Sequence, residues 1–210
     1  MRCFREPVNG FTHLAGAFLA AVGLVWLLAL AWGETAKLVT VLIYGLSMIA
    51  LYLASATFHL ARGSERMLLW LRRLDHAAIY GLIAGTYTPI CYAVLDGGWR
   101  WGMLALVWGF AVVGAAYKLA RLRQGSRWSL VFYLVMGWLG LLALPKALAV
   151  LPPGAILMIA AGGAAYLVGA AIFAIRRPNF HPHFGHHEIW HLCVLAGSAF
   201  HFAAIARYFV

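Results

Sequence analysis

Two histidines four residues apart stand at the start of the last apolar stretch of the chain. The sequence HHEIWH occupies residues 186–191, so in a helix His187 and His191 lie one turn apart on the same face. Imidazole nitrogens are common zinc ligands. The pair alone is weak evidence for a metal site, because a histidine in an apolar helix often hydrogen-bonds a neighbouring helix instead. Its interpretation depends on partners elsewhere in the chain.

Two further motifs offer such partners. The stretch SATFH contains Ser55 and His59, and RRLDHAAIY contains Asp75. Three imidazoles with an open fourth position form a recurrent catalytic zinc arrangement, and zinc suits nitrogen ligands better than calcium or magnesium does. Asp75 could bind the metal or hold its water. Ser55 lies one helical turn from His59 and could hydrogen-bond that water, Asp75 or a substrate oxygen.

A structural interpretation stays open for each of these residues. Asp75 could simply pair with Arg72 or Arg73 at the end of a helix, and each histidine could bridge two helices. Several other polar residues are expected to lie outside the site. We expect His76 to point elsewhere, Glu188 to meet loop arginines, and His13 and His201 to serve in packing or hydrogen bonding.

The composition is that of an integral membrane protein. Of the 210 residues, 64% are hydrophobic and only 10% are charged, whereas a soluble domain carries about 25% charged residues. The formal charge of +10 is explained by basic residues at lipid headgroups, so we expect membrane lipids as partners and no nucleic acid. No cleavable signal peptide is expected. The cysteines Cys3, Cys91 and Cys193 are isolated, which argues against disulfides and thiolate metal sites.

Seven apolar stretches predict an all-α bundle of seven transmembrane helices that forms one domain over residues 1–210. Each stretch approaches the roughly 20 residues that a helix needs to cross the hydrocarbon. Glycine, proline and charged residues separate them, and small residues within them favour close helix contacts. The expected helices are 11–32, 37–60, 74–95, 99–120, 128–150, 154–175 and 187–208.

The basic residues predict the orientation of this bundle. The N-terminus and the loops after the second, fourth and sixth segments hold twelve of the sixteen: Arg2, Arg5, Arg62, Arg66, Arg72, Arg73, Lys118, Arg121, Arg123, Arg127, Arg176 and Arg177. The other side holds Lys37, Arg100, Lys146 and Arg207. Positive charge favours the cytoplasmic side, so we expect a cytoplasmic N-terminus and an external C-terminus. The three motifs then share one depth near the cytoplasmic surface, where His59, His187 and His191 can meet.

These motifs together resemble a known family. The N-terminal EPVNGFTH, which contains Glu6, Asn9, Thr12 and His13, the Ser55–His59 pair, Asp75 and the His187–His191 pair are similar to the motifs of bacterial hemolysin III-like members of the progestin and adipoQ receptor (PAQR) family. The resemblance covers essentially the whole chain and implies a zinc ion near the cytoplasmic side of a multi-pass protein of the bacterial inner membrane. It implies that His59, His187 and His191 are the ligands, that Asp75 acts through water and that Ser55 lies beside it.

Three functions are compatible with the family. Its Ser, Asp and three-His set is similar to that of the alkaline ceramidases, which implies zinc-dependent hydrolysis of a lipid amide or ester that enters between helices, with Asp75 and Ser55 as catalytic residues. A non-enzymatic sensor or regulator of the membrane state, held together by a structural zinc, is the alternative; membrane homeostasis fits both. A pore-forming hemolysin is the least favoured, because a secreted toxin needs a soluble form that this apolar sequence does not offer.

The orientation can be tested with reporter fusions. We expect a reporter at the C-terminus to behave as external to the cytoplasm, because twelve of the sixteen basic residues lie on the side of the N-terminus. A fusion after Arg121 serves as the matched cytoplasmic control. Cytoplasmic activity at both positions would mean that one segment does not cross the membrane.

Overall fold

The computed structural model describes residues 4–120, 127–181 and 184–210. The expectations for Arg2, Cys3, Arg121 and Arg123 therefore lie outside the described residues. Within them the chain is helical and has no strand, only an isolated bridge between His181 and Phe184. The elements are α1 (Pro7–Leu30), α2 (Thr35–Leu60), α3 (Glu65–Val94), α4 (Gly97–Ala120), α5 (Arg127–Trp138), the 3-10 helix η1 (Leu139–Ala143), α6 (Leu144–Val150), α7 (Pro153–Ile175) and α8 (His186–Tyr208).

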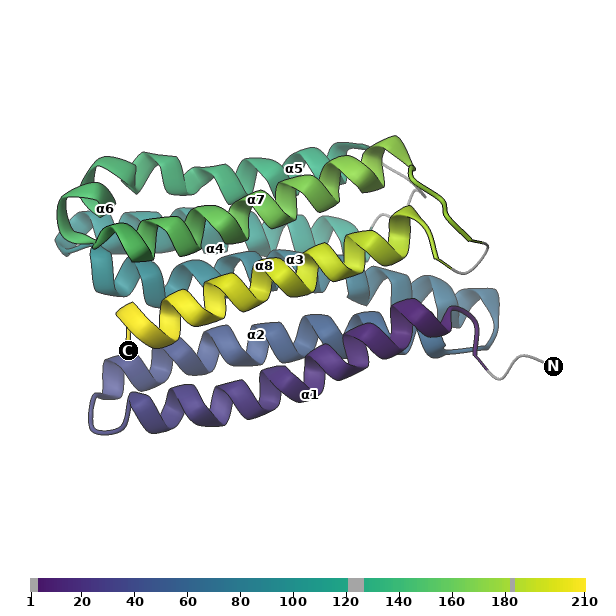
Figure 1. The fold of residues 1–210 in the computed structure, drawn as a ribbon, viewed down its shortest axis with the longest axis horizontal. Coiled ribbons are helices and arrows are strands. Elements are labelled where there is room, and N and C mark those ends of the chain that lie inside the picture. The colour runs from purple at the N-terminus through teal and green to yellow at the C-terminus, as the bar shows by residue number, and fades with distance from the viewer. Residues whose placement is uncertain (1–3, 121–126, 182–183) are drawn as a thin grey trace.

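The helices form an elongated antiparallel bundle (Figure 1). In the described part of the chain seven helical spans are long and apolar enough to cross a membrane, with α5, η1 and α6 together making the fifth. The predicted seven-helix membrane fold is thus confirmed. The N-terminus of α1, the C-terminus of α2 and the N-termini of α3 and α8 lie at the same end of the bundle. The shared depth of the three motifs follows from this arrangement, whereas the side of the membrane that they face stays a prediction.

Two helices begin four or more residues before the predicted start, whereas the other starts agree within two residues. The first begins at Pro7 rather than at residue 11, because proline is well suited to the first helical position, where no N–H is needed. The third begins at Glu65 rather than at residue 74, because the Ser64 side chain accepts a hydrogen bond from the Met67 N–H and caps the helix. Charged residues after Ser64 had suggested a loop. They extend α3 to 30 residues, about 45 Å, which exceeds the hydrocarbon thickness.

The fifth predicted segment is interrupted in its middle. The α-helix ends at Trp138 and passes through the 3-10 turn η1 into α6, where Pro145 has no N–H to continue the ladder. Tyr87 of α3 compensates for the break. Its hydroxyl lies 3.0 and 2.7 Å from the carbonyl oxygens of Met136 and Gly137 and accepts a hydrogen bond from the Gly140 N–H at 2.7 Å. Backbone groups freed inside a membrane need such partners.

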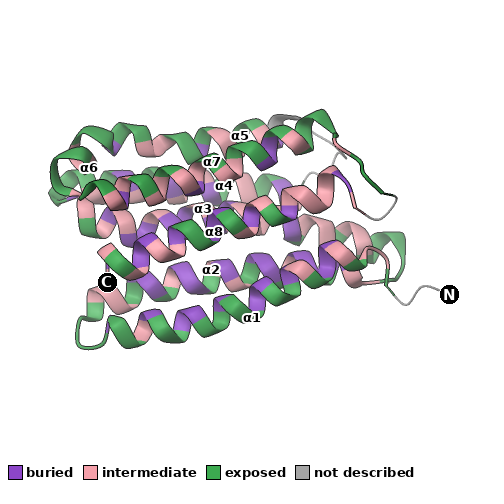
Figure 2. Cartoon of the chain, in the orientation of Figure 1, coloured by how far each residue is buried: buried purple, intermediate pink, exposed green. Residues whose placement is uncertain are grey.

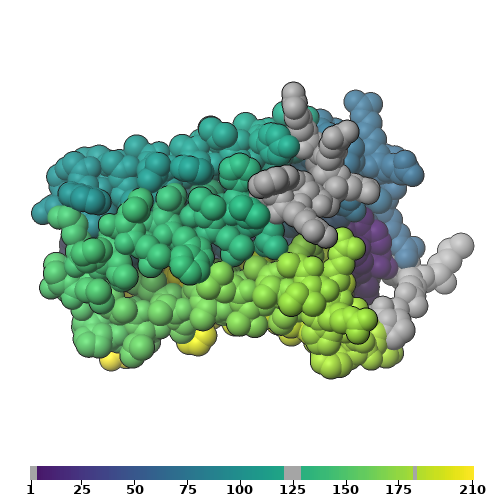
Figure 3. Space-filling view, turned by 90° about the horizontal axis from the view of Figure 1, so that it is seen from above, coloured from purple at the N-terminus to yellow at the C-terminus, as the bar shows by residue number. Residues whose placement is uncertain are grey.

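Burial is concentrated on the inward faces of the helices (Figure 2). One core cluster is formed mainly by α1, α2 and α8, and a second mainly by α3, α4 and α5. Large apolar side chains remain exposed on the outside, as lipid-facing residues should, including those of α5 and α7 on the face seen in Figure 3. The fifth span is the least buried of the seven, since only 6% of its most apolar 18-residue stretch is buried inside the bundle.

Close packing of α2 against α3 depends on Gly85. A Cβ atom built on Gly85 would lie 2.8 Å from the Ser47 Cβ atom, which no rotamer of serine can move, whereas one on Gly81 would meet nothing within 4 Å. Gly81→Ala should therefore leave stability unchanged or raise it by up to about 1 kcal/mol through helix propensity. Gly85→Ala should instead cost about 1–3 kcal/mol by overpacking. Thermal unfolding in detergent checks the pair, and equal melting temperatures would contradict the close approach.

Candidate metal centre

Three histidines from two helices meet at the end of the bundle where the chain begins. Each of His59 on α2 and His187 and His191 on α8 offers one ligand atom, and these atoms all lie within 4.8 Å of one another. The ring centroids are 5.0 Å apart for His59 and His187, 4.8 Å for His59 and His191, and 4.9 Å for His187 and His191. The predicted convergence of these three side chains is confirmed. It arises because α2 ends where α8 begins.

Asp75 and Ser55 lie beside this cluster. Asp75 is 8% exposed and Ser55 is 1% exposed. Ser55 and His59 both lie close enough to Asp75 to interact with its carboxylate. Asp75 does not belong to the group of ligand atoms within 4.8 Å. Among the described residues no salt bridge joins Asp75 to Arg72 or Arg73, although Arg72 is close enough to interact with the carboxylate electrostatically.

Glu6 contacts the cluster, a role that the sequence did not predict. Its Oε2 atom lies 2.6 Å from Nδ1 of His59, and its backbone N–H donates to the His59 carbonyl oxygen at 3.0 Å. Burial by itself would raise the pKa of the Glu6 carboxyl group, but the hydrogen bond and charge of His59 and the charge of Arg5 hold this pKa at about 2. An ionised carboxylate on Nδ1 leaves the Nε2 atom of His59 free to bind a metal.

A second contact ties the start of α1 to α8. The Asn9 side-chain amide donates to the Glu188 carboxylate at 2.8 Å, and the same carboxylate accepts from the Gly185 N–H at 2.8 Å. The expectation that Glu188 meets loop arginines was therefore wrong. The reason is its position in the first turn of α8, where a carboxylate satisfies an otherwise unpaired N–H. The Asn9–Glu188 contact fixes the first turn of α8, which carries His187.

His13 also reaches the cluster. Its ring stacks on that of His191 with centroids 3.8 Å apart, and it is 3% exposed. Nδ1 of His191 is buried without a hydrogen-bond partner in the described residues. The spacing of Glu6, Asn9 and His13 places all three on the side of α1 that faces α2 and α8. Polar residues at such helical spacing at the start of an apolar run are the sequence signal that could have identified them.

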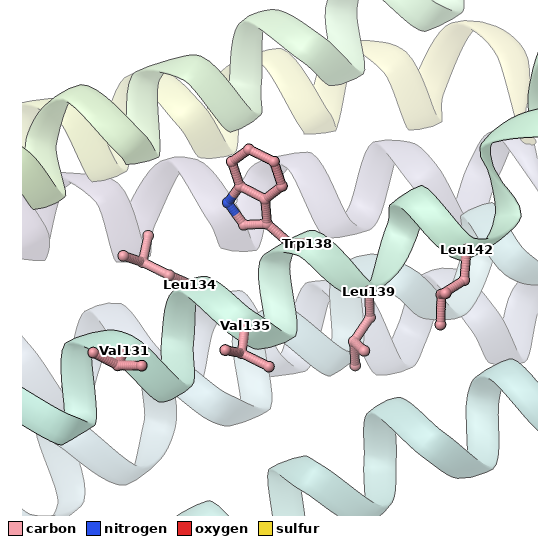
Figure 4. Close-up of a pocket in the computed structure, with 6 residues that line it drawn as sticks. All are labelled: Val131, Leu134, Val135, Trp138, Leu139 and Leu142. Atoms are coloured by element: carbon pink, nitrogen blue, oxygen red, sulfur yellow. The ribbon is translucent and has the colours of Figure 1, made fainter.

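One apolar surface groove shares no residue with the histidine cluster. A groove of about 400 Å³ is lined by residues of the fifth span: Val131, Leu134, Val135, Trp138, Leu139 and Leu142 (Figure 4). These side chains are apolar apart from the Trp138 ring nitrogen and carry no catalytic group. Acyl chains of lipid would fill such a groove in a membrane. The histidine cluster, in contrast, is enclosed by the bundle.

The chemistry of the donors fits a zinc ion. The three nitrogen donors lie close enough together to share one ion, and two of the histidines are almost fully buried, His59 at 1% and His191 at 3% exposure. Imidazole suits zinc and other late divalent metals, whereas magnesium and calcium prefer oxygen. Nδ1 of His191 has no hydrogen-bond partner among the described residues, so it is available as a donor to a metal ion. The Glu6 carboxylate orients the ring of His59. The cluster can therefore hold a metal ion, whose identity the donors favour but do not fix.

Metal analysis tests the site. Purified protein should bind one zinc ion per chain, and His59→Ala, His187→Ala or His191→Ala should remove most of it, since each variant deletes a ligand. Glu6→Gln should weaken the affinity by about 10–100-fold, which is the usual effect of losing a carboxylate behind a ligating histidine. Competition with a chelator measures this difference.

Two controls make the comparison specific. His76→Ala removes another membrane histidine that lies outside the cluster, and Glu34→Gln removes a carboxylate that pairs with Lys37 at the opposite end of the bundle. Both should keep the metal affinity of the wild type. Full occupancy in all three ligand variants would exclude this ligand set.

Comparisons with known proteins agree with the fold and the motifs. Residues 1–202 match the model of a family described as Haemolysin-III related. Hemolysin-3 of Bacillus cereus is 37% identical over 205 residues, which cover 97% of this chain and 91% of that protein. The hemolysin-3 homolog of Bacillus subtilis (strain 168) is 35% identical over 207 residues, with 98% and 94% covered.

A more distant relative extends the similarity beyond bacteria. The human monocyte to macrophage differentiation factor is 27% identical over 210 residues, with 98% of this chain and 85% of that protein covered. The resemblance read from the motifs is therefore confirmed. With a family match that spans nearly the whole chain and seven helices that can cross a membrane, this multi-pass membrane protein belongs to the hemolysin III family.

Proposed function

We propose that this protein is a zinc-dependent hydrolase of a lipid amide or ester, which acts at the cytoplasmic side of the bacterial inner membrane and serves membrane homeostasis. One observation carries the proposal: a carboxylate and a hydroxyl, Asp75 and Ser55, lie beside three histidines whose ligand atoms are within 4.8 Å of one another. Metal ligands alone would be sufficient for a structural site. The adjacent buried carboxylate is what hydrolysis needs in addition.

Zinc held by the three imidazoles would supply Lewis-acid chemistry, polarising the carbonyl group of the lipid and acidifying water. Asp75 would accept a proton from the attacking water and pass it to the amine or alcohol that leaves, so that one water and one lipid give a carboxylic acid and an amine or alcohol. The Ser55 hydroxyl would orient Asp75 or donate a hydrogen bond to the developing oxyanion. Glu6 would keep the His59 ring in one tautomer and orientation.

The exposed outer surface is compatible with a lipid substrate. Large apolar side chains are exposed on α3 and α8 near the end that carries the cluster, among them Trp70, Leu74 and Leu192. A lipid approaching from the membrane would need to pass between the helices that carry the cluster. A soluble substrate would gain nothing from this apolar surface.

A structural zinc in a sensor of the membrane state is the alternative. The observation in its favour is the burial of the cluster, since the groove of about 400 Å³ lies on the fifth span and not at the histidines. In that function the ion would hold α2 and α8 together, and changes in the surrounding lipid would alter their packing. The two functions predict different effects of removing the Asp75 carboxylate on lipid hydrolysis.

Turnover per bound zinc separates them. Asp75→Asn should keep most of the metal and the fold but lose about 10²–10⁴-fold in hydrolysis of a panel of lipid amides and esters, as expected for the removal of a general base. Ser55→Ala should lose less. Asp96→Asn, at the opposite end of the bundle near Lys146, is the matched control and should stay active. An unchanged ratio of activity to zinc in Asp75→Asn would sink the hydrolytic mechanism, and no turnover by the wild type would favour the sensor.

A further inference from the structure

Two tyrosine hydroxyl groups are buried in the bundle without a hydrogen-bond partner. Tyr44 and Tyr52 of α2 are 0% and 2% exposed, and neither hydroxyl has a partner among the described residues. A buried threonine avoids this problem by bonding its own helix, as Thr86 does with the Leu82 carbonyl oxygen at 2.8 Å. The tyrosine hydroxyl is too far from its own backbone for such a bond. Unpaired polar groups are especially unfavourable inside a membrane.

Tyr52 continues a line of polar groups that starts at the histidine cluster. The His13 ring stacks on His191 at 3.8 Å, and the Tyr52 ring meets His13 edge-on at 5.0 Å. Both ring nitrogens of His13 are buried without a partner among the described residues. The side chains of His191, His13 and Tyr52 therefore form a contiguous series, which carries unpaired hydrogen-bond donors and acceptors from the cluster into the bundle.

The line extends further from Tyr52. The hydroxyl groups of Tyr166 on α7 and Ser198 on α8 are 3.0 Å apart, and Tyr52 lies close to both. Tyr44, eight residues before Tyr52 on α2, belongs to the same core cluster as Tyr52, against which Tyr166 packs. His13, Tyr44, Tyr52, Tyr166 and Ser198 come from four helices, and we call this set the polar column.

The polar column is open to the histidines at one end and closed at the other. Fifteen residues of α2 separate His59 from Tyr44, which corresponds to about 22 Å along the helix. Beyond Tyr44 the interior is mainly apolar: Leu27, Val41 and Ile205, from three helices, are each 0% exposed, and the buried Thr40 hydroxyl is bonded to its own helix at the Lys37 carbonyl oxygen. This apolar plug separates the polar column from the opposite end of the bundle.

We propose that the polar column binds a chain of ordered water molecules that runs from the histidine cluster to Tyr44 and ends at the apolar plug. Water is the ligand that matches it, because the groups are neutral and most both donate and accept hydrogen bonds, and none carries a fixed charge that would select an ion. A buried water typically makes about three hydrogen bonds, and the unpaired atoms of His13, Tyr52 and Tyr44 supply them. This inference goes beyond the proposed hydrolysis: the water is there whether or not the site turns over a lipid.

Hydroxyl-radical labelling tests the proposal on the wild-type chain in lipid nanodiscs. X-rays generate the radicals from water in place, so a buried side chain is oxidised when ordered water touches it. Tyr44 and Tyr52 should be labelled. The control is Met136 in the second core, which is 0% exposed and whose thioether is also readily oxidised by hydroxyl radicals, yet it should stay unlabelled. The continuous chain of water would be contradicted if Tyr44 and Tyr52 were as protected from labelling as Met136, or if only Tyr52 were labelled.

A pair of tyrosine variants gives an independent measurement. Tyr87→Phe removes a hydroxyl that the backbone of the fifth span already satisfies, so its melting temperature should fall. The melting temperature of Tyr44→Phe should fall as well, by about 2–4 °C, if the Tyr44 hydroxyl is bound to water. An unpaired hydroxyl would give the opposite sign, because its removal relieves a buried unsatisfied group. An unchanged or raised melting temperature would contradict water at Tyr44, and neither measurement depends on metal or turnover.

Discussion

The site depends on the free-energy cost of holding imidazoles inside an apolar bundle. A polar group that leaves water must find a partner, and this cost is highest where lipid excludes any alternative. His59 and His191 are almost completely buried, yet only His59 has a hydrogen bond, with Glu6 at 2.6 Å. A shared cation would satisfy the remaining nitrogens at once. The architecture around the histidines follows from this requirement, because ligands from α2 and α8 have to be held at one depth.

The start of the chain performs much of that positioning. The Arg5 guanidinium donates to the Phe58 carbonyl oxygen at 2.7 Å and stacks over the Phe58 ring at 4.2 Å, while Glu6 holds His59. Asn9 then reaches Glu188 on α8. Three residues thus bind both helices that supply the histidines: Arg5 and Glu6 just before α1, and Asn9 in its first turn. Glu6 stands at the N-cap position of α1 but makes no side-chain cap, because its carboxylate is used on His59 instead.

Tight and loose packing are divided between the two halves of the bundle. Glycines let α1, α2 and α8 approach one another closely around the site, and the fifth span on the far side is interrupted and mostly exposed to lipid. A rigid half suits the fixed geometry of metal ligands. A loosely packed half suits movement of lipid or a response to the membrane. The same division therefore serves a hydrolase and a sensor, which is why the fold alone does not choose between them.

The sequence by itself determined the number of membrane spans and the three histidines that meet. Hydrophobic length sets the spans, since each must cross the same hydrocarbon thickness, and alternating direction then puts His59, His187 and His191 at one end. Periodicity also gave the His187–His191 face. These conclusions need only the local sequence and the order of the segments. The sequence does not predict the early start of α3, because charged residues are typical of loops and only Ser64 marks the helix boundary.

Only the tertiary structure decided what surrounds the histidines. The partner of a carboxylate such as Glu6 or Glu188 depends on which helices are neighbours and how they are rotated, and helix periodicity fixes neither. For the same reason the break of the fifth span could be located only once Tyr87 was seen on its carbonyl groups. The unpaired hydroxyls of Tyr44 and Tyr52 are equally invisible in the sequence, where they are two apolar-looking aromatics in a membrane helix. A contact between segments distant in the chain depends on how the helices pack, and local sequence patterns do not determine that packing.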